Sequence, residues 1–140
     1  MRTIAPPAVL VVDDDLEHLQ ITRLFLRAEL PAADVMLCRT GAQALLALSH
    51  LPGGTLVLID RLLDGVESFQ TVVAIRERRP DLAVVMISAA LSSVDRAYAL
   101  ACGARDAIEK PATLAAWRAA LAQMGIAGPA VVSPRGRFAA

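Results

Sequence analysis

The stretch AVLVVDDD, residues 8 to 15, sets a short apolar run directly against three consecutive acidic residues. Ala8 to Val12 has the length and aliphatic composition of a strand that is buried on both faces. Burying an ionised carboxylate without a partner is costly, and adjacent like charges repel each other. Asp13 and Asp14 must therefore be solvated or gathered to bind a cation, whereas Asp15 is expected to cap a following helix.

Four further short apolar runs follow, and amphipathic stretches separate them. We expect strands over residues 8–12, 34–38, 55–59, 83–87 and 105–109. We expect helices over about residues 16–30, 66–79, 92 or 93 to 101, and 112–124, and a further helix that Thr40 caps and that runs through Gln43 to His50. Pro31 and Pro80 follow two of these helical stretches and end them. Apolar strands that alternate with helices predict a parallel sheet with helices on both faces.

The composition limits the class of protein. The chain has 140 residues, 56% of them hydrophobic, with 14 basic and 14 acidic residues, so it carries no excess charge to bind nucleic acid or a membrane surface. No apolar run approaches the roughly 20 residues of a membrane span, and the N-terminus does not read as a secretory signal. Cys38 and Cys102 are interpreted as free thiols of a cytoplasmic protein.

We divide the chain into a short N-terminal lead of residues 1–7, one domain over residues 8–124 and a C-terminal tail of residues 125–140. In the tail, proline and glycine are too closely spaced for a regular element, so we expect it to be mobile. The alternative is that Val131, Val132 and Phe138 form a docking segment for a partner.

Polar residues stand where the predicted strands end. Asp13 and Asp14 follow the first strand, Asp60 ends the third, Ser88 ends the fourth and Lys110, the only lysine, follows the fifth. In doubly wound sheets, ligands bind at the carboxyl ends of the strands. If the first and third strands are neighbours, the three carboxylates share one pocket, which suits Mg²⁺. A hydroxyl and an ammonium beside them suit a phosphoryl group.

Four segments, taken together, resemble the receiver domain of two-component response regulators. They are VLVVDDD, LVLIDRLLDG, VVMISA and GARDAIEKP, in the order and spacing of that family, and the match covers about Val9 to Met124. The resemblance implies a flavodoxin-like, doubly wound (βα)5 fold. Its parallel five-stranded sheet would have the order 2-1-3-4-5, with helices on both faces.

The resemblance also implies a role for each residue of the site. Asp60 would be the phosphoacceptor, Ser88 the switch hydroxyl and Lys110 the cation that pairs with the phosphate. The implied Mg²⁺ ligands are the carboxylates of Asp13, Asp14 and Asp60 and the main-chain carbonyl of Leu62.

The implied function is that of a phosphorylation-dependent signalling switch or phosphorelay carrier. The phosphoryl group would come from a sensor histidine kinase or a histidine phosphotransfer protein. The protein would not be an enzyme, although it would take part in its own Mg²⁺-dependent phosphoryl transfer and hydrolysis. Because the tail is too short for a DNA-binding module, we expect output through a downstream protein, with no nucleic acid or membrane partner. The last two helices are a candidate homodimer surface.

Three positions depart from the pattern of the family. Ala107 stands three residues before Lys110, where the family usually has an aromatic residue whose burial accompanies movement of the switch hydroxyl. Asp64 stands where the family favours proline, and Ser68 where it favours glycine, although Asp64 and Gly65 still indicate a turn. A second interpretation therefore stays open: a pseudo-receiver that binds proteins with little or no phosphorylation-driven switching.

A third interpretation is an aspartate-nucleophile phosphatase. That class usually has a second Asp two residues after the nucleophile, and this position holds Leu62, so we rank it last. Leu62 and Ala90 would flank the phosphoryl group, and neither can orient an attacking water. We therefore expect slow self-dephosphorylation.

Other candidate residues have simpler interpretations. His18 and His50 are interpreted as surface or partly buried histidines rather than phosphodonors. The arginines at 76, 78 and 79 are interpreted as a solvated helix end. Trp117 is open between a core anchor and a partner-facing residue.

Overall fold

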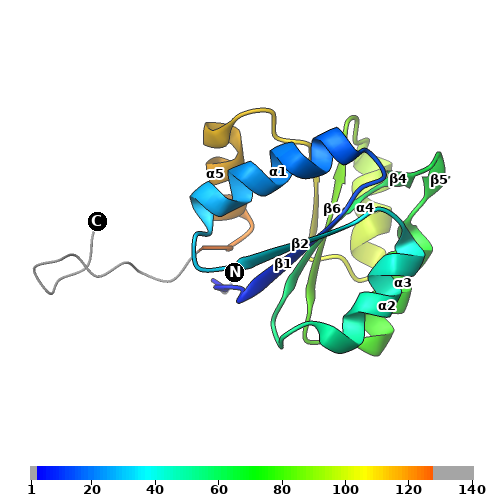
Figure 1. Ribbon diagram of the computed structural model, residues 1–140. Helices are drawn as coiled ribbons and strands as arrows, with labels where there is room; N and C mark the ends of the chain where they lie inside the picture. The colour runs from blue at the N-terminus through cyan, green and yellow to red at the C-terminus, as the bar shows by residue number, and fades with distance from the viewer. Residues whose placement is uncertain (1–2, 128–140) are drawn as a thin grey trace, which may run out of the picture.

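The computed structural model describes residues 3–127, in which a five-stranded parallel sheet lies between two layers of helices (Figure 1). The strands are β1 (Ala8–Val12), β2 (Asp34–Cys38), β3 (Leu56–Asp60), β6 (Ala83–Ser88) and β7 (Asp106–Glu109). Their order is β2-β1-β3-β6-β7, and every neighbouring pair is parallel. The predicted flavodoxin-like fold, with strand order 2-1-3-4-5, is confirmed.

The helices cover both faces of this sheet, as Figure 1 shows. They are α1 (Leu16–Glu29), α2 (Gly41–Ala47), α3 (Phe69–Arg78), α4 (Ser93–Ala101) and α5 (Leu114–Gln123), and a 3-10 turn, η1 (Leu48–His50), follows α2. One core contains residues of α1 and α5, and the other contains residues of α2, α3 and α4. Within residues 3–127, no helix has the length and apolar character needed to cross a membrane.

The buried run of β1 supplies both cores, because successive residues of a strand face opposite sides of the sheet. Val9 and Val11 belong to the core under α1 and α5, whereas Leu10 and Val12 belong to the opposite core. Trp117 packs in the first of these cores and is 2% exposed. The core-anchor interpretation of Trp117 is therefore confirmed.

Side-chain caps fix where several helices begin. The Asp15 carboxylate accepts hydrogen bonds from the backbone N–H groups of Glu17 and His18, as predicted for a cap of α1. The Thr113 hydroxyl caps α5 in the same way by accepting from Ala116 N–H. The predicted last helix began at residue 112, and this cap explains why the observed one begins at Leu114.

The largest difference from the predicted elements lies after β3. The predicted helix over residues 66–79 begins only at Phe69, because Val66–Glu67 forms β5, which pairs antiparallel with β4 (Leu62–Leu63). Asp64 and Gly65 connect these strands with φ values of 54° and 75°. Two successive residues with positive φ form the tight turn that matches the twist of a hairpin, so the turn chemistry outweighs the helical spacing of Val66.

Two arginines of the predicted solvated helix end bind the backbone instead. Arg76 donates to the carbonyl oxygens of Pro80 at 2.8 Å and Leu82 at 2.7 Å. Arg79 donates to the carbonyl oxygens of Leu48 and Leu51. For Arg76 and Arg79 the interpretation was wrong, since backbone carbonyls in neighbouring loops need these donors.

The predicted lead and the beginning of the predicted tail pair with each other. Ile4 N–H donates to Gly125 O at 2.7 Å, and Ala127 N–H donates to Ile4 O at 2.9 Å. Residues 128–140, including Val131, Val132 and Phe138, lie outside the described residues. The expectations of a mobile tail and of a docking segment at those positions stay predictions.

The turn after α4 provides a stability test. Gly103 has φ 106°, and a Cβ atom there would lie 2.9 Å from Cγ of Arg76. We expect Gly103→Ala to lower the free energy of unfolding by about 1–3 kcal/mol, because both the backbone and the contact become strained. Urea denaturation measures the loss.

Gly53→Ala is the matched control. Its backbone is outside the positive-φ region, and the nearest atom to an added Cβ is Asp81 Oδ2 at 3.7 Å. We expect the free energy of unfolding of this variant to change by less than about 0.5 kcal/mol. Equal losses in the two variants would contradict the role assigned to Gly103.

Candidate functional site

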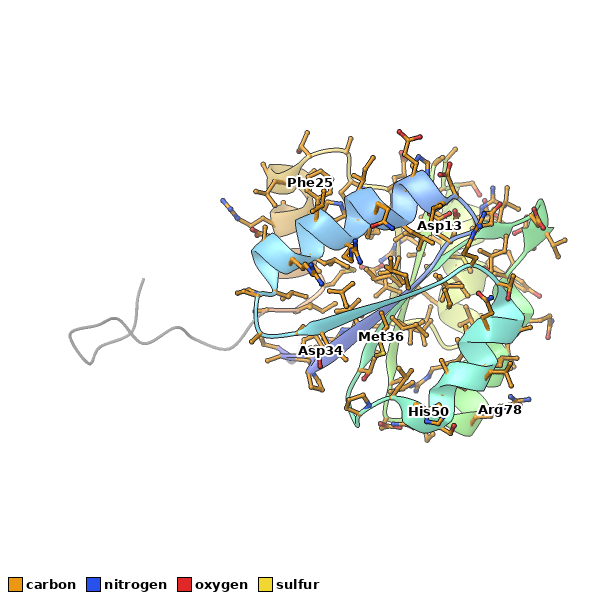
Figure 2. All side chains as sticks on the ribbon, viewed as in Figure 1. Asp13, Phe25, Asp34, Met36, His50 and Arg78 are labelled. Atoms are coloured by element: carbon orange, nitrogen blue, oxygen red, sulfur yellow. The ribbon has the colours of Figure 1, made fainter. Side chains whose placement is uncertain are left out.

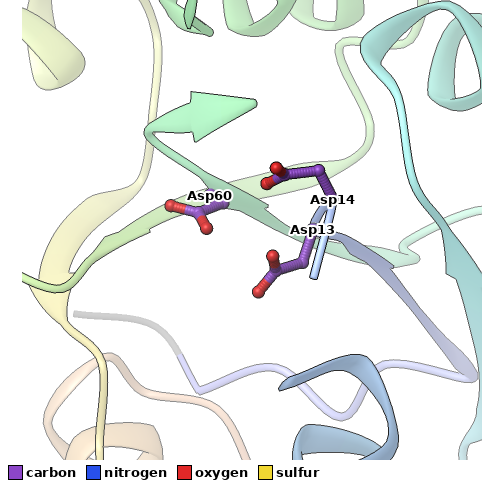
Figure 3. Close-up of side chains that lie close together, drawn as sticks. All are labelled: Asp13, Asp14 and Asp60. Carbon is purple, nitrogen blue, oxygen red and sulfur yellow. The ribbon is translucent and has the colours of Figure 1, made fainter. Parts of the chain in front are cut away.

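Three carboxylates converge at the carboxyl ends of two neighbouring strands, as Figure 3 shows. Asp13 and Asp14 follow β1, and Asp60 is the last residue of β3. One carboxylate oxygen of each lies within 4.8 Å of those of the other two. Asp13 is 2% exposed and Asp60 is 8% exposed, so the charge is concentrated where water screens it poorly.

Lys110 lies against two of these carboxylates. Its Nζ is 2.8 Å from Oδ2 of Asp60 and 3.3 Å from Oδ2 of Asp13. The backbone N–H of Lys110 donates to Ser88 O at 2.8 Å. This hydrogen bond fixes the position of the Lys110 backbone beside the end of β6. The single ammonium therefore offsets the repulsion between two buried carboxylates.

The pKa values of this pair are shifted by opposing influences. Burial, the largest influence, and the nearby Asp13 charge raise the pKa of Asp60 above its ordinary value of 3.8, although the hydrogen bond and charge of Lys110 oppose them. Burial lowers the pKa of Lys110, but the hydrogen bonds and charges of Asp60 and Asp13 outweigh it and leave that pKa raised. Lys110 is consequently positively charged at neutral pH.

Ser88 is brought to the same sheet edge, but its hydroxyl is turned to other groups. It is the last residue of β6, the neighbour of β3, and is buried. Its Oγ donates to the main-chain carbonyl of Ala90 at 2.8 Å and accepts from Arg61 Nε at 3.2 Å. A hydroxyl bonded in this way must rotate before it can donate to a group on Asp60.

Sequence reasoning missed Arg61, whose only signal was its position directly after Asp60. Its Nη1 lies 2.6 Å from Glu67 Oε1 in the hairpin, and its Nε lies 3.9 Å from Asp95 Oδ2 in the first turn of α4. With the bond to Ser88, this guanidinium contacts three separate elements at the rim of the site.

The loop after Asp60 holds the carboxylate and its backbone. Leu62 N–H lies 3.4 Å from Asp60 Oδ1, a long hydrogen bond that orients the carboxylate. Ser68, which is buried, donates its hydroxyl to the main-chain carbonyl of Asp60 at 2.6 Å. The serine in place of the family's glycine therefore has a specific partner, while a ligand role for the Leu62 carbonyl stays a prediction.

The two histidines differ in position. His18, in the first turn of α1, has its Nδ1 3.3 Å from Lys110 Nζ and 3.9 Å from Asp13 Oδ2. Its half-exposed side chain agrees with the interpretation of a surface or partly buried histidine, whereas its position beside Lys110 and Asp13 was not predicted. His50 lies at the opposite end of the molecule from Asp13, as Figure 2 shows.

The comparison with known families agrees with this geometry. The family described as "Response regulator receiver domain" matches residues 9–122. The chain belongs to this family. The receiver resembles the transcriptional regulatory protein CpxR homolog of Haemophilus influenzae, with 32% identity over 103 residues. It also resembles the DNA-binding response regulator MtrA of Mycobacterium tuberculosis, with 34% identity over 103 residues.

Each of these two matches covers 74% of this receiver and 43% of the relative, so the receiver spans less than half the length of these relatives.

Among solved structures, a response regulator from Thermotoga maritima has a TM-score of 0.73 and 25% identity, over 86% of this chain and 98% of the other. A CheY-like receiver domain protein from Methanospirillum hungatei has a TM-score of 0.73 at 21% identity, over 86% and 94%. At that identity the likeness shows the fold alone.

Cys38 and Cys102 both lie within residues 3–127 and are free thiols, as predicted. Burial raises the pKa of the Cys38 thiol to about 11, so this side chain is a neutral thiol at neutral pH.

The raised pKa of Asp60 predicts how stability depends on pH. A carboxyl with a raised folded-state pKa favours folding below the unfolded value of 3.8 and loses that contribution as pH rises through the folded value. We therefore expect Asp60→Asn, in Mg²⁺-free buffer, to have a higher urea midpoint than the parent protein at neutral pH. The gap should narrow as pH falls toward 3.8.

Asp81→Asn is a control for which we expect a change in stability of the opposite sign. A hydrogen bond from Arg79, the largest influence, lowers the pKa of Asp81 to about 2. This carboxylate stabilises the fold above 3.8, and the contribution is lost as pH falls toward 2. Asp81→Asn should therefore lower the midpoint at neutral pH, and a change of the same sign in both variants would contradict the assignment.

Proposed function

We propose that this receiver is a phosphorylation-dependent signalling switch or phosphorelay carrier. It accepts a phosphoryl group on Asp60 from a sensor histidine kinase or a histidine phosphotransfer protein. The observation that carries the proposal is the contact of Lys110 with both Asp60 and Asp13, beside Asp14. Phosphoryl transfer to a carboxylate needs fixed positive charge where negative charge gathers, and this arrangement supplies it.

In the proposed transfer, a carboxylate oxygen of Asp60 attacks the phosphorus of a phosphohistidine. The new P–O bond forms as the P–N bond breaks, and the electron pair of that bond stays on the imidazole nitrogen. Lys110 is already 2.8 Å from Asp60 and offsets charge on the transferred oxygens. Hydrolysis later adds water at phosphorus, which releases inorganic phosphate and restores the carboxylate.

The residues present fit Mg²⁺. Three carboxylate oxygens within 4.8 Å form an all-oxygen donor set, and this ion favours oxygen ligands. Asp13, Asp14 and Asp60 would hold it, with the Leu62 carbonyl as a further proposed ligand. When bound, Mg²⁺ supplies positive charge to the phosphoryl oxygens.

We propose further that the output passes through contacts with a downstream protein in the cytoplasm, without a nucleic acid or membrane partner. DNA binding is stated for MtrA, of which the matched region is less than half. The last two helices, α4 and α5, are the proposed homodimer surface. Val94 and Tyr98 of α4 and Leu114 at the start of α5 are exposed apolar residues of these helices.

Intact-mass spectrometry after incubation with acetyl phosphate tests the proposal. We expect one added phosphoryl group in the presence of Mg²⁺ and none with a chelator. Without the cation, the negatively charged carboxylates repel the anionic acetyl phosphate. Asp60→Asn should take up none. Asp81→Asn, a carboxylate change outside the site, should be labelled like the parent protein.

The outcomes separate the three interpretations. A parent protein that takes up no phosphoryl group from either acetyl phosphate or phosphorylated kinase would favour the pseudo-receiver, which Ala107 and Asp64 motivate. Repeated turnover of free phosphoesters would favour the phosphatase.

The lifetime of the aspartyl phosphate is a further prediction. The side chain of Leu62 is apolar and partly exposed, and Ala90 is exposed, so neither offers a polar atom to an attacking water. We expect the double variant Leu62→Asn with Ala90→Ser to shorten the half-life of the aspartyl phosphate several-fold. The decay of the phosphorylated species, monitored by intact-mass spectrometry, measures this half-life. Leu46→Asn, an exposed leucine of α2, is the control and should leave the half-life as it was.

A further inference from the structure

Arg61 is held in place by its backbone as well as its side chain. Its N–H donates to Ile87 O at 2.8 Å, and its carbonyl accepts from Ser68 N–H at 2.8 Å. Its side chain is only 16% exposed. An arginine fixed in this way differs from a solvated surface cation, because it has lost most of its rotamer freedom and keeps a defined set of partners.

The partners of Arg61 belong to three elements that are separate in sequence. Ser88 ends β6, Glu67 lies in the hairpin strand β5, and Asp95 lies in the first turn of α4. The same Nε atom faces Ser88 Oγ at 3.2 Å and Asp95 Oδ2 at 3.9 Å. Ser88 and Asp95 therefore compete for one donor, while Glu67 holds Nη1 at 2.6 Å.

Movement of the Ser88 hydroxyl would decide this competition. Serine has one proton to donate, and here it goes to Ala90 O at 2.8 Å. To donate to a phosphoryl oxygen on Asp60, the side chain must leave that bond for another staggered rotamer. The oxygen then leaves Arg61 Nε, and Asp95 Oδ2 becomes the available acceptor for that donor. A hydrogen bond between two charged groups there is stronger than the one to the hydroxyl.

The small side chain at position 107 makes another route necessary. Ala107 is 2% exposed and lies on β7 beside β6. Its methyl group has no second position to occupy, so it cannot report where the Ser88 hydroxyl lies. Any signal from Ser88 to α4 must pass through other atoms, and Arg61 contacts both Ser88 and α4.

We propose that Arg61 is a positioning residue that couples the Ser88 hydroxyl to the first turn of α4. In the unmodified protein it holds Ser88 turned away from Asp60. When Ser88 turns to the phosphoryl group, Arg61 binds Asp95 and draws the start of α4 toward the end of β6. The inference rests on the proposed phosphorylation of Asp60 and names the residue that carries that event to the surface.

Hydrogen–deuterium exchange of the α4 peptide, followed by mass spectrometry, tests this coupling. We compare unmodified protein with protein labelled by acetyl phosphate, at matched phosphate occupancy. In the parent protein, phosphorylation should slow exchange in the first turn of α4. Arg61→Met and Asp95→Asn should each lose that response, because each removes one partner of the new hydrogen bond.

Arg78→Met is the matched control. It makes the same change of charge and shape at an exposed position of α3. Figure 2 places it at the end of the molecule opposite Asp13. Its phosphorylation-dependent change in α4 exchange should equal that of the parent protein.

The possible results are distinguishable. If the parent protein takes up no phosphoryl group by mass, the proposed function itself fails. If it is labelled and α4 does not respond, or if Arg61→Met and Asp95→Asn respond like the parent protein, the coupling role is wrong. Should Arg61→Met fail to fold, Asp95→Asn decides, since it leaves the contacts of Arg61 with Ser88 and Glu67 in place.

Discussion

The rest of the site depends on the gathering of like charges at one edge of the sheet. Three carboxylates have oxygens within 4.8 Å of one another, and the cation beside them is Lys110, at 2.8 Å from Asp60 and 3.3 Å from Asp13. The topology makes this contact available, since β7 lies beyond β6 and only a long side chain after β7 reaches back to β3 and β1. A buried charge cluster of this kind is tolerable only when a fixed counter-charge is present.

The sequence predicted the fold well where burial alone decides the structure. Strands such as β1 and β3 are buried along their whole length, so a continuous apolar run identifies them. The strand order came from the family resemblance, because apolar runs bury equally well in any order. The hairpin of Leu62–Leu63 and Val66–Glu67 was missed, because two-residue strands carry too little periodicity to outweigh the helical pattern that follows.

The site was predictable to the extent that parallel strands bring their carboxyl ends together. That rule places Asp13, Asp60, Ser88 and Lys110 at one edge. It does not give the direction of the Ser88 hydroxyl or the partners of Arg61. These depend on side-chain rotamers and on which elements the fold brings together, such as Arg61 and Ser88, which are 27 positions apart. Position next to a candidate nucleophile is a weak signal in sequence, and it becomes informative only when the contacts of the side chain are known.

Two of the departures from the family pattern, Asp64 and Ser68, lie in the loop that follows Asp60. Proline, which the family favours at position 64, has its φ fixed near −65°, whereas Asp64 has φ 54°. The hairpin therefore requires a residue other than proline there, and the hairpin places Glu67 2.6 Å from Arg61. This protein has alanine at position 107 instead of the family's aromatic residue and a hairpin after Asp60. It also has an arginine, Arg61, that contacts both Ser88 and α4. Under the proposed coupling, Arg61 would carry the signal from Ser88 to α4 in a receiver that lacks the aromatic residue.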